Sequence, residues 1–543
     1  MNKYYVTTAI DYANAAPHIG HAYEKIGADV VARYQRLLGK EVFFLTGTDE
    51  HGIKVEKAAK AADMTPEAFV DANAAKFQEA WKCLLIEPDY FIRTTEPRHK
   101  KVVQDVFRKM RDKGDVYKGS YTGLYCEGCE DFLRERDLVN GVCQNHQKAP
   151  REVKEENYFF RLSKYKDALR TWLTSEEKPV KPDSRRNEVL NQLDDPELTD
   201  FSITRSRSAL SWGIPAPDEP DQVIYVWIDA LTNYITGAGY LSDDAAWQKW
   251  WPADLHLIGK DITKFHSIYW PAMLMSIDVP LPKLVFGHGF ITVEGQKMSK
   301  TLGNVLDPVW LSETYRADSV RYFLLSANTF DQDGDFSRSD MISRVNSHLA
   351  NGVGNLLNRA VSLLDRNFDA TVPDVVQDKH CLELVEQNSL RYHEFMAEFE
   401  FAKAIRAIFD IVDEANKYIN DNKPWALFKE GKKEEGGAVI VTAMTMLKQA
   451  ALLLCPVTPQ LSADIWDQLG YNNKITEINV NSPEYKNPIP TGQVVRNKGP
   501  VFVRIEEEID AEKADGKSAE GKKTEGKKYE GKKSDGKKPA DKI

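Results

Sequence analysis

The sequence predicts an α/β protein in which a doubly wound parallel sheet is interrupted by an insertion and followed by an all-α domain. Three observations support this class. Short apolar strands flank an amphipathic helix near the N-terminus, apolar strands return from about residue 222, and only long amphipathic helices follow from about residue 341. With 543 residues, the chain is too long for a single hydrophobic core, so several domains are expected.

The first strands and the first helix predict an anion site. The segments "YYVTTAI" from Tyr4 and "EVFFLTGTDEHG" from Glu41 are typical of strands, and apolar residues recur on a helical period between them, over residues 19–37. His18 and His21 lie three residues apart on the opening turn of that helix, and so share one face. Backbone N–H groups are unpaired there and the helix dipole is positive, which favours bound anions.

Residues 118–221 break into short segments rich in cysteine, proline and charge, which indicates an insertion. Within it, Cys126 and Cys129 form one chelating pair, and Cys143 and His146 form a second. Two such pairs can close a tetrahedral zinc site with no open position, which would be structural. The alternatives are four unligated residues or a disulfide, and a disulfide is disfavoured in a cytosolic chain.

Apolar strands are expected again at "QVIYVWIDAL" from Gln222, "DLHLIGKDI" from Asp254 and "KLVFGHGFITV" from Lys283, so the insertion splits one α/β domain. Lys297 and Lys300 follow in the glycine-flanked loop "GQKMSKTLGN". They are either surface charges or a mobile cationic clamp for phosphate oxygens. The expected divisions are 1–117 and 222–296 for the two halves of the α/β domain, 118–221 for the insertion, 297–340 for the lysine loop and a stem-contact region, 341–508 for the helical domain and 509–543 for a tail.

Composition limits the remaining segments. The apolar stretch "AVIVTAMTMLKQAALLLCPV" from Ala438 carries polar residues at helical spacing, which favours a core helix over a membrane span. The tail repeats an acid-Gly-Lys-Lys pattern with almost no apolar residue, and is expected to be disordered. The N-terminus lacks the features of a signal peptide, so a cytoplasmic protein without a membrane partner is expected. A net charge of −10 leaves room for a local basic face that binds nucleic acid.

Two segments, "TAIDYANAAPHIGH" and "GQKMSKT", resemble the signatures of class I aminoacyl-tRNA synthetases. With "FFLTGTDEHG", "YVWIDALTNY", "LIGKDITKFHSIYWPAM" and "NDNKPW", the chain resembles the methionyl-tRNA synthetase family nearly throughout, to about Arg504. The resemblance implies the class I Rossmann-type doubly wound parallel sheet with a zinc-knuckle insertion, followed by an all-α helix bundle that binds the anticodon. It also implies one structural Zn²⁺, because this chain has ligands for one zinc only.

The implied reaction has two steps. L-methionine and ATP, accompanied by Mg²⁺, give methionyl-adenylate and pyrophosphate, and the methionyl group then passes to the 3′ end of tRNA(Met), including the initiator tRNA. Positioning and charge stabilisation carry such a reaction, with little covalent chemistry from side chains. By resemblance, His18, His21, Lys297 and Lys300 stabilise the transition state, and Arg205 orients the neighbourhood of the substrate. The implied ATP-binding residues are His18, Gly20, His21, Gly259, Asp261, Lys297 and Lys300.

The resemblance also implies an aromatic-rich methionine pocket, with Asp49 holding the substrate ammonium group. Aromatic edges favour a polarizable thioether sulfur. The remaining implied pocket residues are Ala9, Ile10, Tyr12, Trp227, Ala230, Tyr234, Ile262, Phe265, His266 and Trp270. Two positions depart from the family: Asp11 replaces the usual Tyr or Pro, and Ala9 replaces a Pro found in one branch.

In the helical domain, Asn355, Arg359, Pro424 and Trp425 match the family residues that read the CAU anticodon, by stacking and hydrogen bonds to base edges. A monomer is expected, because no dimerising β-barrel follows residue 508. Two alternatives remain open. One is a sister synthetase for Leu, Ile, Val or Cys, or another nucleotidyltransferase with the same phosphate signature. The other is a catalytically silent tRNA-binding paralogue.

Overall fold

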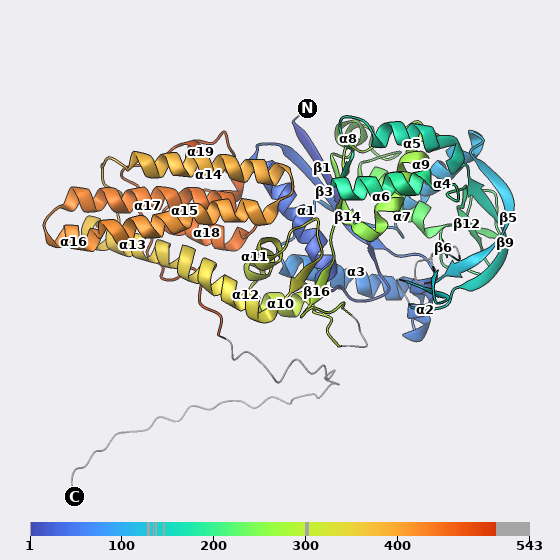
Figure 1. The fold of residues 1–543 in the computed structure, drawn as a ribbon, viewed down its shortest axis with the longest axis horizontal. Helices are drawn as coiled ribbons and strands as arrows, with labels where there is room; N and C mark the ends of the chain where they lie inside the picture. The colour runs from blue at the N-terminus through green and yellow to red at the C-terminus, as the bar shows by residue number, and fades with distance from the viewer. Residues whose placement is uncertain are drawn as a thin grey trace, which may run out of the picture. The chain divides into compact units, whose positions relative to one another are not determined.

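A seven-stranded parallel sheet is the centre of the α/β domain (Figure 1). The computed structural model describes residues 2–127, 131–133, 135, 138–144, 147–298 and 303–506. The predicted tail and the residues Cys129, His146 and Lys300 are not among the described residues. All the elements below belong to the unit formed by residues 1–505. The strand order is β10 (Val180–Lys181), β15 (Val285–His288), β14 (Leu255–Gly259), β1 (Lys3–Thr8), β3 (Glu41–Asp49) and β2 (Asp11–Tyr12), with β4 (Tyr90–Arg93) also paired to β3.

The two faces of this sheet are covered by different helices, which makes the domain doubly wound. Val6 and Phe44 belong to a hydrophobic cluster with α1 (Ile19–Leu37), whereas their neighbours Tyr5 and Leu45 belong to a second cluster with α4 (Pro97–Asp112) and α7 (Val226–Gly237). Alternation along each strand sends successive side chains to opposite faces. The prediction of a doubly wound parallel sheet is therefore confirmed.

The domain also contains α2 (Ile53–Ala61), α3 (Pro66–Cys83), α8 (Asp244–Trp250), the 3₁₀ turn η3 (Lys260–Ile262), the π-helix η4 (Phe265–Tyr269) and α9 (Trp270–Ser276).

The segment from Gln222 differs from its prediction as a strand. Only β13 (Gln222–Ile224) is extended, and it pairs antiparallel with β12 (Thr204–Ser206) outside the main sheet. The chain enters α7 at Val226, and nearly every residue of that helix is buried. A helix buried on all sides has an apolar sequence without amphipathic period, so it resembles a buried strand.

The insertion is mainly an antiparallel sheet, which lies at the opposite end of the α/β domain from the helical bundle (Figure 1). Its strand order is β11 (Phe201–Ser202), β9 (Arg151–Phe160), β5 (Val116–Cys126) and β6 (Asp131–Leu133). A two-stranded hairpin, β7 (Leu138–Val139) and β8 (Val142–Cys143), turns at Asn140 and Gly141, both with positive φ. Two helices, α5 (Lys166–Leu173) and α6 (Asp183–Asp194), complete this region, and β10 within it joins the main sheet.

Helices follow the second half of the sheet, as predicted. The chain passes from β16 (Ile291–Val293) through α10 (Pro308–Tyr315) and α11 (Ala317–Ala327) to β17 (Gly334–Phe336), which pairs with β16. The bundle then comprises α12 (Arg338–Val345), the π-helix η5 (Asn346–Gly354), α13 (Asn355–Phe368), α14 (Lys379–Ala397), α15 (Phe401–Asn422), α16 (Pro424–Lys429), α17 (Lys433–Leu454), α18 (Pro459–Gln468), the 3₁₀ turn η6 (Ile475–Glu477) and α19 (Pro483–Lys486).

Helix α17 is the core of the bundle and packs against α13, α14, α15, α16 and α18. Among the described helices it alone is long and apolar enough to cross a membrane by length and composition, and 94% of its most apolar window is buried inside the protein. The prediction of a core helix here is confirmed.

Gly47 is a position where the sheet admits no side chain. A Cβ there would lie 1.9 Å from the carbonyl oxygen of Ile92 on β4, which is backbone and cannot move aside. Gly47→Ala should therefore lower the free energy of unfolding by about 3 kcal/mol or more, through a forced separation of β3 and β4. Gly352→Ala, whose Cβ would meet nothing closer than 3.5 Å, is the control in urea unfolding. Equal stability of the two variants would contradict this pairing.

Candidate active site

Helix α1 begins with two histidines that cap its first turn. The backbone of His18 is extended, its Nδ1 accepts a hydrogen bond from Gly20 N at 3.1 Å, and its own N–H donates to His21 Nδ1 at 3.2 Å. The two rings stack with their centroids 3.8 Å apart. Because each Nδ1 accepts from a backbone N–H, each ring is neutral and carries its proton on Nε2. Burial lowers the pKa of His21 well below its usual value, which keeps that ring neutral.

The lysine loop lies against this same turn. Ile19 N donates to Leu306 O at 3.1 Å, and Asn304 Nδ2 donates to Lys297 O at 3.2 Å. A Cβ on Gly20 would lie 3.0 Å from the His18 ring and 3.1 Å from the terminal methyl group of Met298. The fold therefore brings the segment that carries Lys297 to the histidine turn. The Lys297 side chain is exposed, and Lys300 lies outside the described residues.

The residues predicted to bind the amino acid come from distant segments that the fold brings together. Strands β2 and β3 pair Tyr12 with Asp49 in register. Trp227 of α7 stacks on Phe265 of η4, with centroids 3.7 Å apart and 6° between the ring planes. Residues Ala9, Ile10, Tyr12, Trp227 and Ile262 all pack on the hydrophobic cluster that contains α4 and α7. Ala230 is buried on α7, one turn from Trp227.

A hydrogen-bonded tyrosine and histidine lie among these residues. His266 Nδ1 is 3.0 Å from the carbonyl oxygen of Ile262, to which it donates, so its Nε2 accepts from the Tyr234 hydroxyl at 2.7 Å. Burial lowers the pKa of His266 to about 4, so the ring is neutral at physiological pH. Trp270 lies beside Tyr234, with the two rings 6.0 Å apart. The aromatic surface is uncharged, and such a surface can hold an apolar thioether.

A buried charge network lies behind the histidine turn and includes Asp11. Lys25 Nζ lies 2.6 Å from Asp11 Oδ1 and 3.0 Å from Glu24 Oε1, and the other oxygen of Glu24 lies 3.0 Å from His288 Nε2. Burial raises the pKa of Asp11 to about 7, against the effect of Lys25. The network gives the departure at Asp11 a structural reason, since Asp11 pairs with Lys25. A lysine at a buried position of α1 was the available signal, but sequence reasoning missed it.

Sequence reasoning also missed a buried carboxylate between two histidines. Asp229 of α7 accepts from His51 Nδ1 and His99 Nε2, each at 2.7 Å, and His99 Nδ1 lies 3.0 Å from Thr236 Oγ1. His51 follows the predicted ammonium-binding residue Asp49 by two positions, and His99 belongs to α4. These three residues, called the triad below, connect α7 to the end of β3 and to α4. Because α7 carries several predicted pocket residues, it is called the pocket helix.

Similar proteins identify the family of this site. Residues 4–151 and 135–361 match the family of tRNA synthetases class I (M), and residues 372–520 match the anticodon binding domain of methionyl tRNA ligase. The methionine–tRNA ligase of Thermotoga maritima is 44% identical over 93% of this chain and 80% of its own length. That of Enterococcus faecalis is 43% identical over 93% and 78%. The chain belongs to the methionyl-tRNA synthetase family.

Solved members of the family have the same fold. Mycobacterium tuberculosis methionyl-tRNA synthetase in complex with methionyl-adenylate superposes with a TM-score of 0.88 at 39% identity, covering 93% of this chain and all of that one. The apo form of that enzyme has a TM-score of 0.81 at 36% identity, covering 93% of this chain and 98% of that one.

The remaining residues predicted to bind ATP or to orient the neighbourhood of the substrate lie near β14 and at the start of α7. Gly259 ends β14, and Asp261 lies in the turn η3 that follows, where burial raises the pKa of its carboxyl. Arg205 of β12 is buried, donates to Ser202 Oγ at 2.9 Å and lies 4.4 Å from the Tyr225 ring centroid. Tyr225 immediately precedes α7, so Arg205 packs at the beginning of the pocket helix.

Two of the four predicted zinc ligands can be described. Cys126 ends β5 and Cys143 ends β8, and both are buried. The loop after Cys143 is closed by hydrogen bonds from Gln147 N to Cys143 O at 2.8 Å and from Cys143 N to Lys148 O at 2.9 Å. Within the described part of the chain, no group of three or more His, Cys, Asp or Glu residues could hold a metal. Cys129 and His146 lie outside that part.

Two of the predicted anticodon residues, Arg359 and Trp425, meet between α13 and α16. The Arg359 guanidinium lies 5.6 Å from the Trp425 ring centroid and donates to Asn420 Oδ1 at 2.8 Å. Trp425 is 39% exposed, and Pro424 is buried as the first residue of α16. Asn355 begins α13 one turn before Arg359 and is exposed. Helix α16 lies at the end of the bundle away from the sheet (Figure 1).

Loss of the Tyr234 hydroxyl should weaken the binding of the amino acid. Tyr234→Phe leaves His266 Nε2 buried without its hydrogen-bond donor. A buried acceptor without a donor is unfavourable, so the His266 ring is no longer held in its present orientation. We expect the KM for the amino acid to rise about tenfold while the KM for ATP is unchanged, measured by ATP–pyrophosphate exchange. Tyr240→Phe is the matched control, because the Tyr240 hydroxyl accepts from Lys109 at 2.6 Å outside the pocket. A parallel rise in both variants would contradict the assignment.

The triad should make stability depend on pH. Although burial opposes its ionisation, His51 and His99 lower the pKa of Asp229 to about 2, from 3.8. The resulting stabilisation, about 2 kcal/mol, is present above pH 4 and is lost as the pH falls through 2. Asp229→Asn should therefore lower the free energy of unfolding by about 2 kcal/mol at pH 7 and by less at pH 3. Urea unfolding at both pH values measures this, and an equal loss at both would contradict an ionised Asp229.

Proposed function

We infer that this chain is a methionine–tRNA ligase, which activates L-methionine with ATP and transfers it to the 3′ end of tRNA(Met), including the initiator tRNA. The observation that carries this conclusion is the family match across both the catalytic part and the anticodon-binding part of the chain. A family member with the same fold holds methionyl-adenylate, which is the intermediate of this reaction.

The histidine turn supplies donors for the first step. The methionine carboxylate attacks the α-phosphorus of ATP in line, and pyrophosphate leaves. His18 and His21 are proposed to donate their Nε2–H groups to phosphate oxygens at the positive end of α1, where charge develops in the transition state. Lys297 and Lys300 add positive charge from the adjoining loop. Mg²⁺ bound with ATP shields the remaining phosphate charge.

The pocket is proposed to select methionine by shape and polarizability. Trp227 and Phe265 offer stacked aromatic surface, and the Tyr234–His266 pair offers a neutral polar group to the sulfur. Asp49, at the end of β3, is proposed to bind the substrate ammonium group. Gly259 and Asp261 are proposed to lie along the ribose of ATP.

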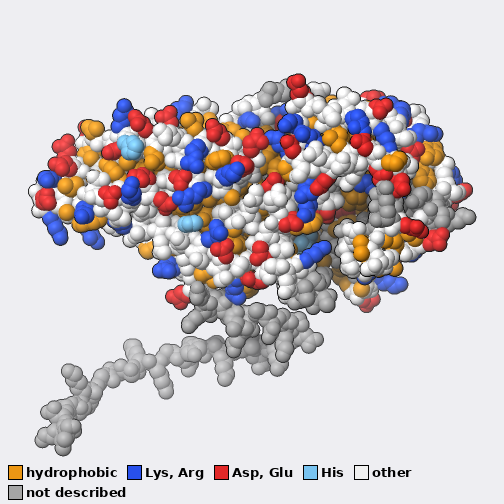
Figure 2. Space-filling model, in the orientation of Figure 1, with side chains coloured by type: hydrophobic (Ala, Val, Ile, Leu, Met, Phe, Trp, Pro, Cys, Tyr) orange, Lys and Arg blue, Asp and Glu red, His pale blue; other side chains and the backbone are white. Residues whose placement is uncertain are grey.

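The tRNA is proposed to contact the end of the bundle with its anticodon and to present its 3′ end to the histidine turn. Arg359 and Trp425 form a cation–π pair whose exposed indole can stack on an unpaired anticodon base, with Asn355 beside it. On the face shown in Figure 2, acidic and basic side chains are interspersed. Binding of tRNA to that face would therefore depend on local contacts more than on a broad positive potential. We further propose a cytoplasmic monomer without a membrane partner, and a scattering mass near 61.6 kDa is expected.

The function is tested by ATP–pyrophosphate exchange with each of the twenty amino acids, without tRNA. Exchange with methionine alone is expected, because the uncharged aromatic pocket fits a thioether. Exchange with another amino acid would keep the mechanism and overturn the pocket assignment. The absence of exchange in folded protein with Mg²⁺ would favour a silent tRNA-binding paralogue.

We propose a structural zinc ion held by Cys126, Cys129, Cys143 and His146. The buried thiols of Cys126 and Cys143 at the ends of two hairpin strands fit such a site, since zinc knuckles place thiolates beside tight turns. One equivalent of zinc is expected by elemental analysis, falling below half an equivalent in Cys143→Ser. Cys381→Ser, on a helix of the bundle, is the control and should keep its zinc. A zinc-free native protein would overturn the proposal.

A further inference from the structure

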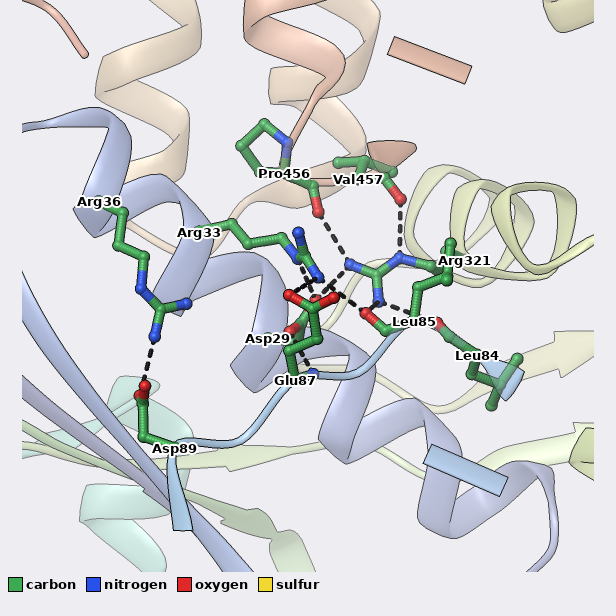
Figure 3. Close-up of polar contacts among 10 residues, drawn as sticks. All are labelled: Asp29, Arg33, Arg36, Leu84, Leu85, Glu87, Asp89, Arg321, Pro456 and Val457. Carbon is green, nitrogen blue, oxygen red and sulfur yellow. Dashed lines mark hydrogen bonds and ion pairs between the residues drawn. The ribbon is translucent and has the colours of Figure 1, made fainter. Parts of the chain in front are cut away.

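Helix α1 reaches from the histidine turn to the junction with the helical bundle. Asp29, on a later turn of the helix, is fully buried, and its carboxylate is the meeting point of this junction (Figure 3). Its Oδ2 accepts from Arg33 Nε at 2.7 Å and from Arg321 Nη2 at 2.6 Å, and its Oδ1 accepts from Glu87 N at 3.0 Å. The carboxylate therefore has three donors from three segments of the chain.

Arg321 of α11 connects three parts of the protein through one planar group. Its guanidinium is fully buried and donates to Val457 O and Pro456 O, each at 2.9 Å, in the corner between α17 and α18 of the bundle. It also donates to Leu84 O and Leu85 O, each at 3.2 Å, after α3 of the α/β domain. With Asp29, these five acceptors match the five N–H donors of an arginine (Figure 3).

The junction beside Arg321 is not closely packed. A cavity of about 410 Å³ opens next to it, lined by Arg33, Arg36 and Pro88 on the α/β side and by Leu452, Cys455 and Pro456 on the bundle side. One hydrophobic cluster joins α1 and α11 to the bundle, so packing holds the two parts together, but a nonpolar contact constrains direction weakly. Beside this cavity the hydrogen bonds of Arg321 add a directional constraint, because its rigid fork admits one arrangement of its five acceptors.

We propose that Arg321 is a positioning residue for tRNA charging, which holds the anticodon-binding bundle in register with α1. This inference rests on the proposed function. A tRNA bound by its anticodon presents its 3′ end to the histidine turn only if the two parts of the protein keep a fixed separation. Activation of methionine uses residues of the α/β domain and the lysine loop, so it does not require that register.

The test separates charging from activation with Arg321→Lys. A lysine keeps the buried positive charge near Asp29 but has three donors at one point, so it cannot reach the acceptors of both domains. We expect the kcat and KM values of methionine-dependent ATP–pyrophosphate exchange to stay within twofold of the parent protein. The kcat/KM for charging full-length tRNA(Met) should fall at least tenfold. Charging of an acceptor-stem minihelix, which has no anticodon, should stay within twofold.

A matched control comes from a second ion pair between the same two parts. Lys181 of β10 lies 2.7 Å from Glu398 at the end of α14, and both side chains are partly exposed. Lys181→Gln should leave exchange, minihelix charging and tRNA charging within twofold of the parent values, because exposed pairs constrain position weakly. A loss of tRNA charging equal to that of Arg321→Lys would overturn the role assigned to Arg321.

The remaining outcomes are also decisive. A parallel fall in exchange, minihelix charging and tRNA charging would show a merely structural role and overturn the proposal, as would unchanged tRNA charging. If Arg321→Lys does not fold, Asp29→Asn replaces it. The amide removes the charge that holds Arg321 and sets an N–H donor against one of the three donors around Asp29, so the same pattern is expected. A parent protein that does not exchange with methionine would contradict the proposed function instead.

Discussion

The parallel pairing of β1 and β2 with β3 is the constraint on which the site depends. Strand β1 pairs Lys3 to Thr7 with the first half of β3, and β2 continues along β3 until Tyr12 lies opposite Asp49. Strands β2 and β3 end at the same edge of the sheet. After β2 the chain enters the turn of His18, and after β3 it enters the loop of His51. A slip of one residue would reverse the face of every side chain in β2.

Buried charges at this edge, and further along α1 at the junction with the bundle, are compensated within the protein. Lys25 has two carboxylates, Asp229 has two histidines, and Asp29 has two arginines and a backbone N–H. Much of the attraction within such groups is offset by the cost of their desolvation. They do restrict geometry, since removal of either partner leaves an uncompensated buried group. The three networks join α1 to β2, α7 to β3 and α1 to the bundle, so they locate the elements that carry the predicted site residues.

The sequence predicted the elements more fully than the contacts between them. The helical period over residues 19–37 corresponds to α1, and the polar residues within the apolar stretch from Ala438 distinguished α17 from a membrane span. The segment from Gln222 was predicted as a strand because a fully buried helix such as α7 has no polar face to reveal its period.

The partners of buried charges could not be predicted at all. His51 and Asp229 are 178 residues apart, and Asp29 and Arg321 are 292 apart, so no local pattern links them. The motifs indicated, through resemblance to a family, which segments are expected to approach the substrate. The hydrogen bonds that hold those segments, and the tautomers of His18, His21 and His266, emerge only from the folded arrangement.

The mutual capping of His18 and His21 has a consequence for turnover. In both rings Nδ1 accepts a hydrogen bond from a backbone N–H, so both rings are neutral. The turn therefore offers hydrogen-bond donors that carry no net charge. A neutral donor binds an oxygen by direction and distance, and its attraction weakens steeply once the angle is lost. Under the proposed function, a phosphate aligned by the rest of the site would be held well, whereas a departing anion that leaves this alignment would not be retained by Coulomb attraction to these rings. The helix start would then combine tight contact during the reaction with ready release after it.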